Sequence, residues 1–142
     1  MADWKKICVA VYFSEPSRFA MVSAAELARG IQADLTVAHV YQAPDEVSIT
    51  PELTENAKGE VAGMLESWRS EAERIASRPV RSMTLLGHPA AELLRFGERE
   101  SFDLLVLATH GRTGLKHLVL GSVAERVVRE ARCPVLVERR KA

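Results

Sequence analysis

The sequence predicts an open five-stranded parallel β-sheet with helices on both faces. Three observations support this class. Five strand-length apolar runs occur along the chain, segments with helical periodicity separate them, and the runs carry little charge, as in strands covered on both faces. The length of 142 residues suits one ordinary domain, so we expect residues 1–142 to form a single unit.

The apolar runs define the strands. The first and fourth runs have uncharged centres, which favours central positions, whereas polar residues in the third and fifth favour the two edges. A chain that winds outward from a central first strand, returns and then winds the other way gives the strand order 3-2-1-4-5. The predicted strands are Ile7–Phe13, Leu35–Tyr41, Val80–Leu86, Asp103–Thr109 and Pro134–Arg139.

The intervening segments carry helix start and stop signals. The first helix is predicted to begin near Ser17 and to stop at Gly30. The third begins at Pro89, a residue suited to the first helical position, and the last begins at Gly121-Ser122. The residues expected to face the sheet from these last two helices are Leu93, Leu94, Val123, Val127, Val128 and Ala131.

A ligand site is predicted where the strand order reverses, between the first and fourth strands. Open α/β sheets bind ligands outside the carboxyl ends of the strands at such a point. The flanking loops are Tyr12–Ser17 and Ala108–Ser122, and the second has glycines at 111, 114 and 121 that let backbone N–H groups approach a ligand. It runs into a helix whose first amides, dipole and Ser122 hydroxyl suit a phosphate.

The start of the last helix also has a purely structural interpretation. Ser122 and Glu125 have the spacing of a capping box, in which the two side chains satisfy the first amides without any ligand. The segment is neither a P-loop nor a GxGxxG motif. An anion site and a helix cap are therefore both open interpretations of Ser122.

Charge and composition narrow the function classes. Lysine plus arginine equals aspartate plus glutamate at 19 each, so no global basic field attracts nucleic acid or an acidic membrane surface. The sequence has neither a signal-peptide pattern nor an apolar stretch long enough to span a bilayer, and we expect a cytoplasmic protein. Cys8 and Cys133 are expected to be reduced thiols rather than a disulfide framework.

Catalysis has little support in the sequence. His39 lies inside an apolar strand and is interpreted as a satisfied core histidine, whereas His110 in the glycine-rich loop could orient the loop or meet a phosphate. Asp103 precedes the fourth strand and so lies at the end of the sheet away from the predicted site. We see no Ser–His–Asp arrangement, paired carboxylates or metal-binding spacing, and we expect a binding protein rather than an enzyme.

The glycine-rich segment resembles the nucleotide-binding motif of the universal stress proteins, G-x2-G-x9-G-(S/T), with Ala108 at the first glycine, Gly111 at the second and Gly121-Ser122 at the end. The resemblance covers essentially the whole chain and includes FSEPS, AHV, GHPAAEL, DLLVLATHGRTG and GSVAERVVREARCPVLVER. It implies a Rossmann-like fold of the adenine nucleotide alpha hydrolase-like type, with ATP and a possible accompanying Mg2+ as ligands.

The resemblance also implies which residues touch the nucleotide. Those ending the first two strands would border the nucleoside, with Val40 on the adenine. Leu107 and Ala108, at the end of the fourth strand, would line the ribose. The phosphates would be held by backbone amides and the Ser122 hydroxyl, in the segment that includes Gly111, Gly121, Ser122 and Val123. The implied site residues are Ala10, Tyr12, Val40, Leu107, Ala108, Gly111, Gly121, Ser122 and Val123.

Tyr12 departs from the family pattern, because ATP-binding members usually carry aspartate there. A tyrosine could stack on a base, offer its hydroxyl to the sugar or fill the pocket. The leading hypothesis is thus an ATP-binding stress or signalling module, and the alternative is an interaction protein whose pocket is filled by Tyr12. Slow ATP hydrolysis fits the fold but lacks an identifiable base.

The last strand suggests a homodimer. An edge strand exposes unpaired backbone groups that can pair with a second copy. Members of the resembled family often dimerise through this element. We expect a dimer interface centred on Val135, Leu136 and Val137.

Overall fold

The computed structural model describes residues 3–42, 51–109 and 121–139 and contains a five-stranded sheet. All its pairings are parallel and its order is β3-β2-β1-β4-β5, which confirms the predicted fold class. The elements along the chain are β1 (Lys6–Ala10), α1 (Glu15–Ile31), β2 (Asp34–Tyr41), α2 (Pro51–Ala76), β3 (Val80–Leu86), α3 (Pro89–Arg99), β4 (Leu104–Ala108), α4 (Ser122–Glu130) and β5 (Val135–Glu138).

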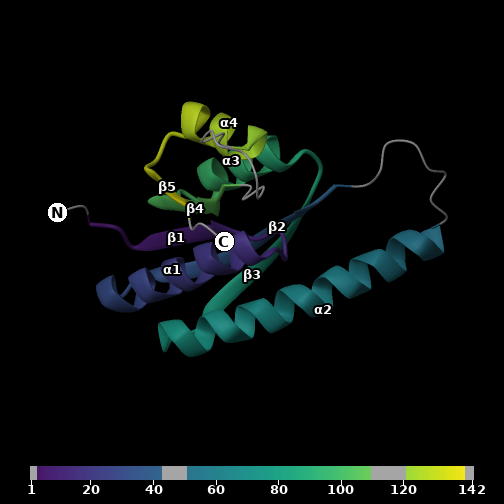
Figure 1. The fold of residues 1–142 in the computed structure, drawn as a ribbon, viewed down its shortest axis with the longest axis horizontal. Coiled ribbons are helices and arrows are strands. Elements are labelled where there is room, and N and C mark those ends of the chain that lie inside the picture. Colours follow the sequence, from purple (N-terminus) through teal and green to yellow (C-terminus); the bar gives the residue numbers. More distant parts are fainter. Residues whose placement is uncertain (1–2, 43–50, 110–120, 140–142) are drawn as a thin grey trace.

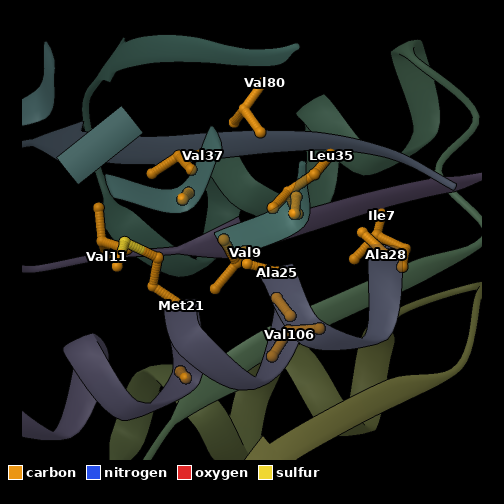
Figure 2. Packing of buried hydrophobic residues seen from close by; sticks show 14 of the residues in the cluster. Ile7, Val9, Val11, Met21, Ala25, Ala28, Leu35, Val37, Val80 and Val106 are labelled. Atoms are coloured by element: carbon orange, nitrogen blue, oxygen red, sulfur yellow. The ribbon is translucent and has the colours of Figure 1, made fainter. Parts of the chain in front are cut away.

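Two helical layers cover the sheet. In Figure 1, α1 and α2 lie on one face, and α3 and α4 lie on the other. Each layer encloses its own core. The larger one packs Ile7, Val9 and Val11 of the central strand against Met21 and its neighbours on α1 (Figure 2). The smaller one lies under α3 and α4 and includes Leu93, Phe96 and Val127.

The central strand serves both cores because successive side chains of a strand point to opposite faces. Ile7, Val9 and Val11 belong to the core under α1 and α2, which we call the α1/α2 core. Cys8 and Ala10 belong to the core under α3 and α4, the α3/α4 core. Every residue from Ile7 to Val11 is at most 4% exposed, which explains why this run has no polar alternation.

The first helix differs from the prediction at both ends. It begins at Glu15, with Ser14 as its N-cap, because Ser14 and Ser17 cap each other reciprocally. It ends at Ile31, and the left-handed residue that terminates it is Gln32 (φ 58°) rather than Gly30. Ser17 therefore lies inside the first turn instead of opening it.

The last helix also differs in one inward-facing residue. Ala124 and Val127, three positions apart, are buried, and Val123 and Ala131 pack against the same core. Val128 is 45% exposed, so its expected inward position is wrong. A helix of nine residues presents only a narrow stripe to the sheet, and Val128 lies beyond it. Within the described residues, no helix is both long and apolar enough to cross a bilayer.

Candidate functional site

The carboxyl ends of β1 and β4 form the predicted reversal point. These two strands are parallel neighbours, while β2 follows on the other side of β1. Helices α1 and α4 both begin at this edge, because each follows the loop that leaves one of the two strands. The edge therefore combines diverging connections, strand ends and two helix N-termini, the arrangement at which open α/β sheets bind ligands.

Five predicted site residues meet at this edge. All five either belong to the α3/α4 core or pack against it. The core members are Ala10, Val40 and Leu107, and the residues that pack against the core are Tyr12 and Val123. Ala10, Val40 and Leu107 are each at most 4% exposed, so they form a buried apolar layer beneath this edge, which we call the apolar floor. Gly111 lies outside the described residues.

Ala108 occupies the other face of the sheet. Leu107 faces the α3/α4 core, whereas the Ala108 side chain packs against the α1/α2 core. This follows from strand alternation, and it leaves only the backbone of Ala108 shared with the side that Leu107 lines. Beyond it, the Thr109 N–H donates to the Glu138 carbonyl at 3.2 Å and continues the pairing with β5.

No described side chain caps the start of α4. Gly121 is the N-cap residue, with φ −53° and ψ 156°, and Ser122 is the first helical residue, with an exposed side chain. Ser122 is thus one position too late to act as the cap, and the capping-box interpretation does not hold here. Because no side chain among the described residues caps this helix, its first-turn amides and positive dipole end suit an anion.

The turn between β1 and α1 is held by one buried hydroxyl. Ser17 is 1% exposed, and its Oγ accepts the N–H groups of Tyr12 and Ser14, each at 3.1 Å. The same hydroxyl donates to the Ser14 carbonyl at 3.0 Å. Sequence reasoning missed this role of Ser17, although the three-residue spacing of the two serines in FSEPS was the available signal.

Phe13 follows Tyr12 in a left-handed backbone conformation, with φ 57°. This region is unfavourable for a bulky side chain and indicates a turn held by its surroundings. The Phe13 ring packs on His39 and Trp68, with centroid distances of 4.6 and 5.4 Å, on the α1/α2 side of the sheet. Tyr12 and Phe13 thus direct their rings to opposite faces.

The Tyr12 hydroxyl oxygen is buried and lacks a hydrogen bond to any described residue. The ring of this tyrosine contacts the α3/α4 core. Burial, with a smaller contribution from Cys8, raises the pKa of Tyr12 to about 12. The phenol is therefore neutral at ordinary pH and can donate a proton to an acceptor.

His39 has a structural partner. Its Nδ1–H donates to the Val11 carbonyl at 2.7 Å, which ties β2 to the end of β1. Its ring lies between the two aromatic residues that follow β1, 4.6 Å from the Phe13 ring and 6.1 Å from that of Tyr12. The hydrogen bond agrees with the prediction that His39 is a satisfied structural residue, although the residue is half-buried rather than in the core.

A cleft lies away from the candidate site, at the C-terminal ends of α3 and α4. Its volume is about 320 Å³, and Leu94, Phe102 and Cys133 line it. The Arg132 Nε donates to the Glu98 Oε1 at 2.9 Å, which pairs two of its charged groups with each other. Among the described residues, no three His, Cys, Asp or Glu side chains are grouped to hold a metal ion there or elsewhere.

The chain is similar in sequence and in fold to known proteins. The model of the universal stress protein family matches residues 3–139. Universal stress protein MJ0531 of Methanocaldococcus jannaschii is 34% identical over 139 residues, which cover 94% of this chain and 81% of that protein. Universal stress protein UspA from Lactobacillus plantarum superposes with a TM-score of 0.80 at 26% identity, covering 98% of this chain and all of the other.

Two further solved structures contain nucleotides. One is a universal stress protein in complex with cAMP, with a TM-score of 0.77, 21% identity and coverage of 96% and 97% of the two chains. The other, from Archaeoglobus fulgidus in complex with dAMP, has a TM-score of 0.71, 21% identity and coverage of 96% and 99%. At this identity the likeness shows the fold. With a family match that spans nearly its whole length, the chain belongs to the universal stress protein family.

Proposed function

We propose that this protein is a cytoplasmic, single-domain module that binds an adenine nucleotide in stress response or signalling, with ATP, accompanied by Mg2+, as the first ligand to test. The observation that carries the proposal is the uncapped start of α4 at the point where strand order reverses. The cAMP and dAMP complexes of two structural neighbours support the ligand class.

The two chemical halves of a nucleotide have matching surfaces at this edge. The backbone amides of Gly121, Ser122 and Val123 would take the phosphates, and the exposed Ser122 side chain adds a hydroxyl. Ala10, Val40 and Leu107 would lie under the nucleoside and supply apolar contact. Gly111 and the backbone of Ala108 complete the proposed set. These groups bind and orient a ligand, and we assign no catalytic residue.

The decisive experiment replaces the N-cap residue of α4. Gly121 has φ −53°, which other residues adopt without strain, and both aspartate and asparagine are favourable N-caps. Gly121→Asp therefore keeps the fold but places a negative charge against the phosphates, and we expect ATP affinity measured by calorimetry to fall about tenfold or more, the factor that corresponds to ~1.4 kcal/mol. Gly121→Asn is the matched neutral control and should lose much less. If the wild type binds none of ATP, ADP or AMP at millimolar concentration, nucleotide binding is refuted.

A second candidate function follows from the position of Tyr12. Its ring packs on the same core as Ala10 and Val40, with a buried hydroxyl, so it could fill the space of a nucleoside. The protein would then act through protein contacts alone. The absence of any thermal shift with ATP, ADP or AMP in the wild type, together with a shift in Tyr12→Ala, would favour this function.

We also propose a homodimer through β5. This strand lies at an edge of the sheet, and its central residues Val135, Leu136 and Val137 are not fully buried, with Leu136 40% exposed. In sedimentation at micromolar concentration we expect a dimer that Leu136→Lys dissociates, because a lysine on an edge strand opposes pairing. Ile31→Lys, at a residue 38% exposed at the end of α1, is the matched control and should remain dimeric. A monomeric wild type would refute the dimer.

A further inference from the structure

We infer that the Tyr12 hydroxyl contributes to nucleotide affinity by donating a hydrogen bond to an acceptor atom of the bound nucleotide. This inference rests on the proposed nucleotide binding and deepens it. The oxygen is buried and has no hydrogen-bond partner within the described residues, at the edge where Ala10 and Val40 form the apolar floor. Buried polar atoms nearly always have a partner, so an exception at a candidate site points to one supplied from outside the described residues.

The turn that carries Tyr12 is held from two sides. The backbone N–H of Tyr12 is fixed by the Ser17 hydroxyl at 3.1 Å. On the other side, the Phe13 ring is packed between His39 and Trp68 on the opposite face of the sheet, so the turn cannot swing without breaking that packing. A donor preset in this way binds an acceptor without first paying the entropy of being ordered.

The chemistry of the phenol defines the acceptor. Because burial keeps the group neutral, it carries one proton to donate, unlike a carboxylate, which only accepts. A nucleotide offers sugar oxygens, ring nitrogens and phosphate oxygens as acceptors. The site should accordingly keep its affinity for a 2′-deoxynucleotide, since the phenol can donate without requiring a hydroxyl donor on the sugar.

The inference predicts two effects of opposite sign for Tyr12→Phe. In the free protein the variant removes a buried polar atom that has no hydrogen-bond partner among the described residues, so its thermal midpoint should rise, by roughly 2–5 °C. In the complex the variant removes a hydrogen bond, so calorimetric affinity for AMP and for dAMP should fall about tenfold. A residue that only packs would not raise stability and lower affinity together.

The control is Tyr41→Phe, which removes the hydroxyl of the chain's other tyrosine, at the end of β2. In this variant we expect neither the rise in thermal midpoint nor the loss of affinity that we predict for Tyr12→Phe. Unchanged AMP affinity in Tyr12→Phe would refute the inference and leave nucleotide binding intact. A lower thermal midpoint of free Tyr12→Phe would also refute it, because the hydroxyl would then have a partner within the chain. If the wild type binds no nucleotide, the proposed function fails first and the inference fails with it.

Discussion

The Ser17 hydroxyl accepts the backbone N–H of Tyr12 at 3.1 Å, across the turn that joins the central strand to the first helix. It also accepts the N–H of Ser14 and donates to the Ser14 carbonyl, so both its acceptor sites and its proton are used. One fully satisfied hydroxyl thus fixes the residue that faces the candidate site. The position of the Tyr12 ring is consequently set by backbone hydrogen bonds as well as by packing.

Removing that hydroxyl should destabilise the protein. Ser17→Ala leaves the N–H groups of Tyr12 and Ser14 without this acceptor, and we expect the free energy of unfolding to fall by about 1–3 kcal/mol. Urea denaturation measures the change. Ser70→Ala, at an exposed position of α2, is the matched control and should change stability by less than about 0.5 kcal/mol. Equal stabilities of the two variants would contradict this account of the turn.

The Asp103 carboxylate should stabilise the sheet at the amino ends of β1 and β4, away from the candidate site. Its Oδ2 accepts the N–H groups of Lys5 and Lys6, both at 2.9 Å, and so joins the start of β1 to the start of β4. We expect Asp103→Ala to lose about 1–2 kcal/mol in urea denaturation, and Asp103→Asn to lose less, because the amide oxygen can still accept. If Asp103→Asn is no more stable than Asp103→Ala, the hydrogen bonds accepted by the side-chain oxygen do not account for the stabilisation.

Tyr12 should lose its proton at a higher pH than an ordinary tyrosine. Burial raises its pKa to about 12, above the ordinary value of 10. The unfolded chain therefore releases this proton at lower pH than the folded chain, so the stability contributed by the neutral phenol is present below pH 10 and is lost as the pH rises through about 12. The difference in phenolate absorbance between wild type and Tyr12→Phe should titrate near 12. A midpoint near 10 would mean that the phenol is solvated.

The two thiols should differ in reactivity. Cys8 is 1% exposed, whereas Cys133 is half-buried beside the cleft between α3 and α4. Burial raises the pKa of both thiols, so reaction with Ellman's reagent should be slow near neutral pH and faster at higher pH. In the native protein only Cys133 should react, and Cys133→Ser should abolish the native-state reaction. Rapid labelling of Cys8 in that variant would reveal opening of the α3/α4 core.

The strands and their order could be predicted because both depend on local composition. Uncharged runs in β1 and β4 indicated burial on two faces, and the polar residues of β3 indicated an edge. The placement of Asp103 away from the candidate site followed from its position before β4, and the contacts of its carboxylate with Lys5 and Lys6 confirm it. These features need no knowledge of side-chain packing.

Features that depend on tertiary contacts were harder to predict. Gly30 was the obvious helix stop, yet the helix continues to Ile31 and ends at Gln32, whose left-handed conformation is uncommon for a residue other than glycine and so is not signalled by local sequence. The sequence also suggested that Leu107 and Ala108 line one surface, whereas alternation along β4 separates their side chains. That the Tyr12 hydroxyl lacks a hydrogen-bond partner in the described part of the chain could not be foreseen, since this depends on all of its neighbours at once.

The left-handed residue Phe13 has a consequence for how occupancy of the site could be observed. One peptide unit separates the ring of Tyr12, on the candidate ligand side, from that of Phe13, whose edge meets the indole of Trp68 on the other side. A guest that shifts the backbone of Tyr12 should therefore disturb the surroundings of the Trp68 indole. The intrinsic fluorescence of Trp68 should thus report occupancy of the site from the opposite face of the sheet.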